Sequence, residues 1–160
     1  VNVIKIKDGK LKGFNTDLLG FLKSLFPFIE SHHEQALLLG TGGASKAVYH
    51  GLQSMDIATT MVSRNPKDHE INYDDIDQEV MQNHQLIINC TPLGMHPKIE
   101  AYPKIPYQEL TRNHLLYDLI YNPTVTQFLA LGDKQGAKIL NGRKMLEIQA
   151  LESWKIWQQE

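Results

Sequence analysis

The residues Gly40–Ser45 have the composition of a phosphate-binding turn. They follow the apolar run Ala36–Leu39 and precede a helical pattern. Glycines at the end of a buried strand let backbone N–H groups approach a pyrophosphate, and the free amides and dipole of the next helix favour negative charge. The usual dinucleotide fingerprint is G-x-G-x-x-G, and Ser45 stands at its last glycine. Alone, the turn therefore predicts a nucleotide site no better than an ordinary strand-to-helix turn.

A second candidate stands about twenty residues later, where dinucleotide-binding folds select the cofactor. A carboxylate at this place would accept a hydrogen bond from a ribose 2′-hydroxyl, whereas a guanidinium can pair with a 2′-phosphate. The chain has Arg64 here, between the neutral donors Ser63 and Asn65, with Lys67 as a second positive charge. This pattern predicts NADP rather than NAD, and the alternative is an ordinary solvated loop.

Other reactive side chains have simpler interpretations. Asp17 precedes an apolar helical run, where an aspartate most often serves only as an N-cap. Cys90 follows a buried-type strand, which is typical of a small core residue rather than a nucleophile. The seven histidines show no metal-ligand spacing and are predicted to be surface or loop residues, so no metal site is expected.

The elements that must position these residues follow from the periodicity of apolar side chains. Asp8-Gly9 predicts a hairpin between strands at 3–7 and 10–14, and apolar positions spaced three and four apart predict a helix that ends near Pro27. Further strands are expected at 36–39, 57–62, 85–89, 115–120 and 137–140, and helices at 44–55, 75–81, 124–131 and from 142 onward. Gly132 is predicted to cap a helix. The last helix repeats apolar residues every three positions, which predicts a core or domain-interface face.

Strands that alternate with helices predict an α/β fold. We expect a Rossmann-like, doubly wound, mostly parallel sheet with helices on both faces, preceded by the β-ribbon and first helix. The whole chain, 1–160, is predicted to be one dinucleotide-binding domain. Ligands of such sheets lie beyond the carboxyl ends of the strands, where the candidate residues gather.

Composition limits the classes of function. The chain is 42% hydrophobic and 21% charged, with a net charge of -2 and a single cysteine. It has no basic run, no apolar stretch of membrane-spanning length and no signal peptide, so we expect a cytoplasmic protein that binds neither nucleic acid nor membrane. It opens at Val1 in a strand-like alternation without Met, which predicts a fragment that lacks part of its chemistry.

Taken jointly, these motifs resemble the shikimate dehydrogenase family. The resemblance covers essentially the whole chain and corresponds to the C-terminal NADP-binding domain of the family. It implies that 1–17 includes the segment that joins this domain to an N-terminal substrate domain. It is carried by the motifs at 13–17, 40–45, 63–65, 88–95, 118–123 and 145–150. It implies reversible reduction of 3-dehydroshikimate to shikimate by NADPH, a step of aromatic amino acid biosynthesis.

The resemblance also implies roles for individual residues. Asp17 matches the aspartate of a catalytic pair, whose lysine belongs to a domain absent from this sequence, so the fragment alone is expected to be inactive. Substrate contacts are implied for Asn2, Asp17, Tyr121 and Gln149. Cofactor contacts are implied for Gly40, Thr41, Gly42, Gly43, Ala44, Ser63, Arg64, Asn65, Lys67, Leu119 and Gly142. The oligomeric state is not predicted.

Three alternatives stay open from the sequence. One is a quinate/shikimate enzyme with relaxed use of NAD and NADP. The second is a nucleotide-binding module without hydride chemistry, and the third is another amino-acid or folate dehydrogenase with the same fold. Asn15-Thr16-Asp17 together with Gln149 is the feature that favours shikimate dehydrogenase.

Overall fold

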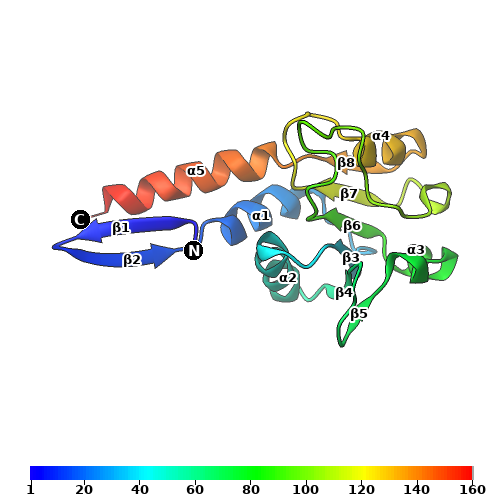
Figure 1. Cartoon of the computed structure of the whole chain (residues 1–160), viewed down its shortest axis with the longest axis horizontal. Helices are drawn as coiled ribbons and strands as arrows, with labels where there is room; N and C mark the ends of the chain where they lie inside the picture. The colour runs from blue at the N-terminus through cyan, green and yellow to red at the C-terminus, as the bar shows by residue number, and fades with distance from the viewer. Residues whose placement is uncertain (160) are drawn as a thin grey trace.

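The computed structural model describes residues 1–159 and consists of a six-stranded sheet with an arm that projects from it (Figure 1). The strands and helices are, in chain order, β1 Val3–Lys7, β2 Lys10–Phe14, α1 Asp17–Leu25, η1 Phe26–Phe28, β3 Gln35–Leu39, α2 Gly43–Ser54, β4 Ala58–Val62, β5 Glu70–Ile71, η2 Tyr73–Asp75, α3 Gln78–Asn83, β6 Leu86–Asn89, η3 Tyr107–Glu109, β7 Leu115–Asp118, α4 Gln127–Lys134, β8 Lys138–Leu140 and α5 Arg143–Gln158.

The main sheet is parallel and has the order β5-β4-β3-β6-β7-β8. The chain therefore leaves the middle of the sheet in opposite directions after β3 and β6, which creates the crevice where doubly wound folds bind ligands. Two apolar clusters cover its two faces. Successive side chains of β3 contribute to the two clusters in turn. Leu37 and Leu39 pack on one face, while Ala36 and Leu38 pack on the other with α1 and α2. The predicted fold class is confirmed.

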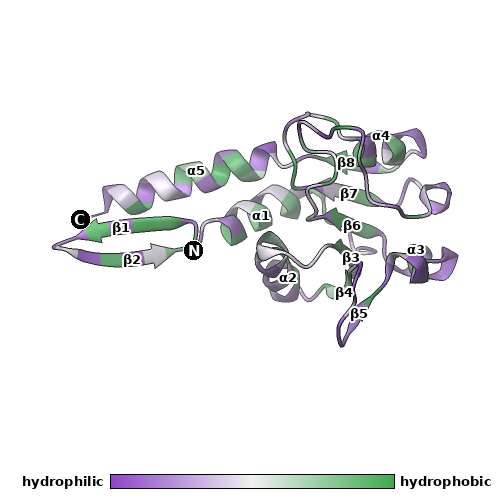
Figure 2. Ribbon diagram, viewed as in Figure 1, coloured by the Kyte–Doolittle hydropathy of each residue, from purple (hydrophilic) through white to green (hydrophobic). Residues whose placement is uncertain are grey.

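The arm consists of the β1–β2 ribbon laid along α5. Asp8 and Gly9 form the predicted turn with positive φ, and β1 pairs with β2 from Val3↔Phe14 to Lys7↔Lys10. The indole N–H of Trp157 donates to the Ile4 carbonyl at 3.1 Å. In Figure 2 the arm carries hydrophobic colour on β1 and along α5, away from the main core.

Several predictions about individual elements are corrected. The expected helix at 75–81 is the 3-10 turn η2 followed by α3, and the two-residue strand β5 was not predicted. Gly132 is not a helix cap, because it lies inside α4, where an added Cβ would sit 2.3 Å from Leu116 Cδ2. The glycine allows α4 to pack closely on β7.

The periodic face of α5 is only partly a packing face. Trp154 is 58% exposed and Trp157 is 52% exposed, and Leu151 is also exposed. These side chains form no part of the core in residues 1–159, so only an interface interpretation of this stripe survives. No helix in that described part is long and apolar enough to cross a membrane.

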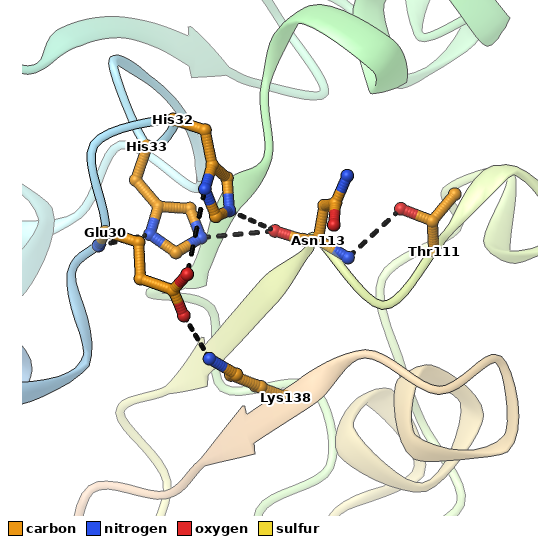
Figure 3. A network of polar contacts seen from close by, with 6 residues as sticks. All are labelled: Glu30, His32, His33, Thr111, Asn113 and Lys138. Atoms are coloured by element: carbon orange, nitrogen blue, oxygen red, sulfur yellow. Dashed lines mark hydrogen bonds and ion pairs between the residues drawn. The ribbon is translucent and has the colours of Figure 1, made fainter.

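Three of the histidines, which were predicted to be surface or loop residues, lie in loops but are buried there. His33, His84 and His114 all lie near the amino ends of the strands. His33 belongs to a network that ties the segment before β3 to β7 and β8 (Figure 3). Its Nδ1 accepts from the Glu30 N–H at 3.0 Å, and its Nε2 lies 3.2 Å from the Asn113 carbonyl. Glu30 also pairs with Lys138 of β8, so the network fixes this edge of the sheet.

Candidate functional site

The glycine turn lies between β3 and α2, as the sequence predicted. Gly40 has a φ of +100°, and an added Cβ would stand 2.9 Å from Thr91 Cγ2, so only glycine fits there. Gly42 is the N-cap of α2 and supplies no side-chain cap. An added Cβ at Gly42 or Gly43 would meet nothing within 4 Å. Gly42, Gly43 and Ala44 line a cavity, so the free amides at the start of α2 can receive an anion.

A first cavity of about 570 Å³ opens between this turn and the end of β4. Its lining residues are Gly40, Thr41, Gly42, Val62, Ser63, Arg64, Asn65, Tyr73, Cys90, Thr91, Pro92 and Leu93. Of these described residues, Arg64 alone carries a charge. This end of the site therefore suits a ligand with negative charge, such as a phosphate monoester.

The loop that carries Arg64 is held in place by the segment after β5. The side-chain nitrogen of Asn72 donates to the Arg64 carbonyl at 3.3 Å, and the Ser63 N–H donates to the Ile71 carbonyl at 2.9 Å. Burial raises the pKa of the neighbouring Tyr73, so its phenol is neutral at physiological pH. Lys67 does not line the cavity, and its backbone N–H is bound to Glu70.

A second cavity of about 550 Å³ adjoins the first. Its lining residues are Gly42, Gly43, Ala44, Cys90, Thr91, Pro92, Met95, His96, Leu119, Ile120, Tyr121 and Asn122. The cavities share Gly42 and the segment 90–92, so they form one trough along the carboxyl ends of β3, β6 and β7. Burial raises the pKa of the Cys90 thiol well above its ordinary value, which keeps the thiol neutral and non-nucleophilic, as predicted.

Gly142 supports the second cavity from behind without lining it. Its N–H donates to the Ile120 carbonyl at 3.0 Å, and an added Cβ would stand 1.9 Å from the Leu119 carbonyl oxygen. The chain after β7 thus packs directly on the start of α5. Gly142 therefore acts on Leu119 by contact between backbones.

A separate polar cluster lies where the ribbon, α1 and α5 meet. The side-chain nitrogen of Asn2 lies 2.9 Å from Asp17 Oδ1 and 3.2 Å from Gln149 Oε1. Thr16 is buried in the cluster, where its hydroxyl lies 3.0 Å from the Asn2 nitrogen and 3.1 Å from Ser153 Oγ. Residues from three distant parts of the sequence are thereby brought together, including three of the four predicted substrate contacts.

The hydrogen bonds of this cluster fix which atoms point outward. The backbone N–H of Thr16 donates to Asn2 Oδ1 at 2.8 Å, so the Asn2 NH₂ group must face Asp17 and Gln149. Gln149 uses its oxygen for Asn2, which leaves its NH₂ group as a donor. The cluster therefore offers a carboxylate acceptor and an amide donor side by side, a pairing that suits a hydroxylated ligand.

Asp17 is not the cap of α1. The helix begins at Asp17 with Thr16 as N-cap, and Asn15 Oδ1 accepts from the Asp17 N–H at 2.9 Å. The Asp17 carboxylate therefore accepts no hydrogen bond from the start of the helix and is available for other contacts. The interpretation of Asp17 as an ordinary N-cap residue is therefore wrong.

Sequence reasoning missed some residues of these sites. Tyr73, Met95 and His96 line cavities only because their loops fold over the sheet edge. Thr16 and Ser153 enter the polar cluster through packing of α1 on α5, which no local pattern reveals. Pro92 lies shortly after the end of β6, a position from which a cavity wall could have been predicted.

Comparisons with known proteins agree with this fold. The chain is 37% identical over 173 residues to shikimate dehydrogenase (NADP(+)) of Methanococcus maripaludis, an alignment that covers 98% of this chain and 62% of that protein. It superposes on a chorismate mutase/shikimate 5-dehydrogenase fusion protein from Clostridium acetobutylicum with a TM-score of 0.82 and 36% identity, covering 97% of this chain and 59% of the other.

A shikimate dehydrogenase solved in complex with NADP+ matches with a TM-score of 0.83 and 31% identity, over 97% of this chain and 60% of that one. No protein-family model matches the chain. The chain spans about three fifths of the length of the curated relatives it matches.

Proposed function

We propose that this chain, a member of the shikimate dehydrogenase family, is the NADP-binding part of an enzyme that reversibly reduces 3-dehydroshikimate to shikimate. The observation that carries the proposal is the pairing of two sites on one fold. One is the trough with Arg64 as its charged residue, and the other is the Asn2–Asp17–Gln149 cluster. The relatives are named as NADP(+) enzymes, in agreement with the cofactor.

The residues of the trough fit a dinucleotide phosphate. The free amides of α2 and the open space before Gly42 and Gly43 suit the pyrophosphate, and Arg64 suits the 2′-phosphate, with Ser63 and Asn65 as neutral donors. Thr41 and Ala44 complete the turn, while Lys67 would contribute its charge from outside the cavity. The second cavity, beside Leu119, would hold the nicotinamide, which supplies the hydride when NADPH is bound.

Reduction of a ketone leaves its oxygen in need of a proton, so the site requires an acid beside the reacting carbon. We assign Asp17 to holding the substrate hydroxyl together with a proton-donating lysine, which the resemblance expects in a further domain. Asn2 orients the Asp17 carboxylate, Gln149 donates to a substrate hydroxyl, and Tyr121 lines the second cavity. Shikimate and 3-dehydroshikimate are the proposed substrates.

The exposed apolar surface of the arm supports the proposal that a second domain packs on it. Ile6 and Leu11 pair across the ribbon near its turn and are 71% and 72% exposed. A second domain packed on the ribbon would cover these apolar side chains. We therefore expect the 160 residues alone to bind cofactor without turnover. We place the complete enzyme in the cytoplasm, in aromatic amino acid biosynthesis.

The test is calorimetric titration of the chain with NADP+, NAD+ and 2′,5′-ADP. We expect NADP+ to bind at least about tenfold more tightly than NAD+, because only NADP+ carries the phosphate that Arg64 can pair with. Equal affinities would favour a quinate/shikimate enzyme of relaxed cofactor use, and no binding of any nucleotide would refute the proposal. The Asn2–Asp17–Gln149 cluster favours an enzyme over a module that only binds nucleotides.

A further inference from the structure

Two loops line both sides of the second cavity, and both are tied to one buried carboxylate. The loop after β6 contributes Thr91, Pro92, Met95 and His96, and the loop after β7 contributes residues 119–122. Asn89 and Asp118 are the last residues of these strands and face each other in the register of the sheet. Both side chains are 0% exposed.

Asp118 accepts hydrogen bonds from three directions. Its Oδ1 accepts from the Ile120 N–H at 3.0 Å and from Asn89 Nδ2 at 3.1 Å. Its Oδ2 accepts from the Thr126 hydroxyl at 2.6 Å. The carboxylate thus bends the chain after β7 back on itself and holds the start of α4, where Thr126 is the N-cap.

Asn89 connects Asp118 to the loop after β6 through hydrogen bonds. Because its NH₂ group faces Asp118, its oxygen must face the loop after β6, where it accepts from the Thr91 N–H at 3.0 Å and the Thr91 hydroxyl at 2.6 Å. The same loop packs on Thr126 at Gly94. Only glycine fits there, because its φ is +101° and an added Cβ would lie 3.3 Å from Thr126 Cβ.

No cation pairs with this carboxylate among the described residues. Burial raises the pKa of Asp118 to about 6 in spite of its three donors. An acid with a raised pKa favours folding below the pKa of the unfolded chain, and that contribution is lost as the pH rises through about 6. At neutral pH the ionised form therefore stabilises the fold less than the protonated form would, whereas its hydrogen bonds still hold both loops.

We infer that Asp118 is a positioning residue that fixes the two loops around the nicotinamide half of the cofactor site. This inference rests on the proposed function for the identity of the ligand. Asp118 touches neither cavity and acts through Asn89, Ile120 and Thr126. It is expected to matter for the nicotinamide half alone, because the adenosine half is built by Gly40, Arg64 and their neighbours.

The test compares two ligands on the 160-residue chain. Asp118→Asn places an amide donor against donors, so we expect the Kd of NADP+ to rise about tenfold while the Kd of 2′,5′-ADP, which lacks the nicotinamide half, changes less than about twofold. Thr126→Val removes one donor with little change of shape and should act in the same direction, which covers the case that Asp118→Asn does not fold. Thr124→Val, at an exposed neighbouring position, is the matched control.

Amide hydrogen exchange of the unliganded protein provides a readout that does not depend on the ligand. Exchange should accelerate in segments 91–95 and 119–121 of Asp118→Asn and stay unchanged in 40–45 and 63–67. Equal weakening of both ligands, or exchange that rises everywhere or nowhere, would overturn the inference. Failure of the unmodified chain to bind 2′,5′-ADP would refute the proposed function instead, and the exchange pattern would still decide the role of Asp118.

Discussion

Asn2 and Asp17 are joined by a hydrogen bond of 2.9 Å between the Asn2 side-chain nitrogen and Asp17 Oδ1. The bond uses one carboxylate oxygen, and no described residue of 1–159 donates to the other, Oδ2. Asn2 itself cannot rotate, because Thr16 holds its oxygen at 2.8 Å. Asp17 therefore presents a single oxygen in a fixed direction. A group that aligns a substrate hydroxyl with a proton donor needs such a fixed orientation.

The first prediction concerns this carboxylate in the complete enzyme proposed above, with its further domain present. Asp17→Asn keeps the shape but replaces the acceptor, so we expect kcat for shikimate oxidation to fall by at least about 100-fold. The Kd of NADP+ should stay the same, because Asp17 lines neither cavity. Steady-state kinetics and titration measure the two effects, with Asp8→Asn in the exposed hairpin turn as control. Undiminished turnover of Asp17→Asn would remove Asp17 from the mechanism.

The second prediction concerns the charge in the first cavity. Arg64→Gln removes the one cationic side chain of its lining, and we expect the Kd of NADP+ to rise by about 10- to 100-fold, on the order of 1.5–3 kcal/mol for a charge-assisted contact. The Kd of NAD+, without the 2′-phosphate, should change little. Calorimetry on the 160-residue chain measures both values, and Arg112→Gln on an exposed loop is the matched control. A parallel loss for both nucleotides would show that Arg64 does not recognise the phosphate.

The sequence predicted the sheet well because its strands are buried and locally distinct. The run at β3 is apolar on both faces and ends in glycines, a pattern that only a central parallel strand satisfies. Element ends were less predictable. Gly132 resembles a helix cap in the sequence, and only the approach of Leu116 from β7 shows why a glycine is needed inside α4.

The candidate site also has a part that the sequence predicts and a part that it does not. The trough could be predicted, because each of its main residues directly follows a strand. The role of Asn2 was implied only by family resemblance, since its partners Asp17 and Gln149 lie far away in the sequence. The burial of His33 was missed because it depends on contact with Asn113, a neighbour that no periodicity identifies.

The third prediction contrasts two glycines at helix starts. Gly142→Ala would bring its Cβ to 1.9 Å from the Leu119 carbonyl oxygen, so we expect a loss of about 1–3 kcal/mol or more in the free energy of unfolding as the backbone shifts. Gly43→Ala begins α2 where nothing lies within 4 Å of the new Cβ. It should leave stability unchanged or raise it by up to about 1 kcal/mol through helix propensity. Urea denaturation of both variants measures the difference. Equal effects at the two positions would contradict close packing at Gly142.

The last prediction concerns the buried histidines at the amino ends of the strands. His33 Nδ1 accepts from the Glu30 N–H, and His114 Nδ1 accepts from the Thr111 N–H at 3.0 Å, so both rings must be neutral. Burial lowers the pKa of each ring, and for His33 the neighbouring His32 lowers it further. A histidine with a lowered pKa stabilises the fold above its ordinary pKa of about 6.5, and this contribution is lost as the pH falls toward the lowered value.

We therefore expect protonation of these rings to lower the free energy of unfolding between pH 7.5 and 5.5. Asp118 acts in the opposite direction over the same range, so a comparison of variants is needed to isolate the histidines. His114→Asn keeps an acceptor for Thr111 and cannot be protonated. It should be less stable than the unmodified chain at pH 7.5 but lose less on acidification, whereas His50→Asn at an exposed position should follow the unmodified chain at both pH values. Urea denaturation at the two pH values decides the matter, and an unchanged pH dependence of His114→Asn would mean that His114 is not held neutral by the fold.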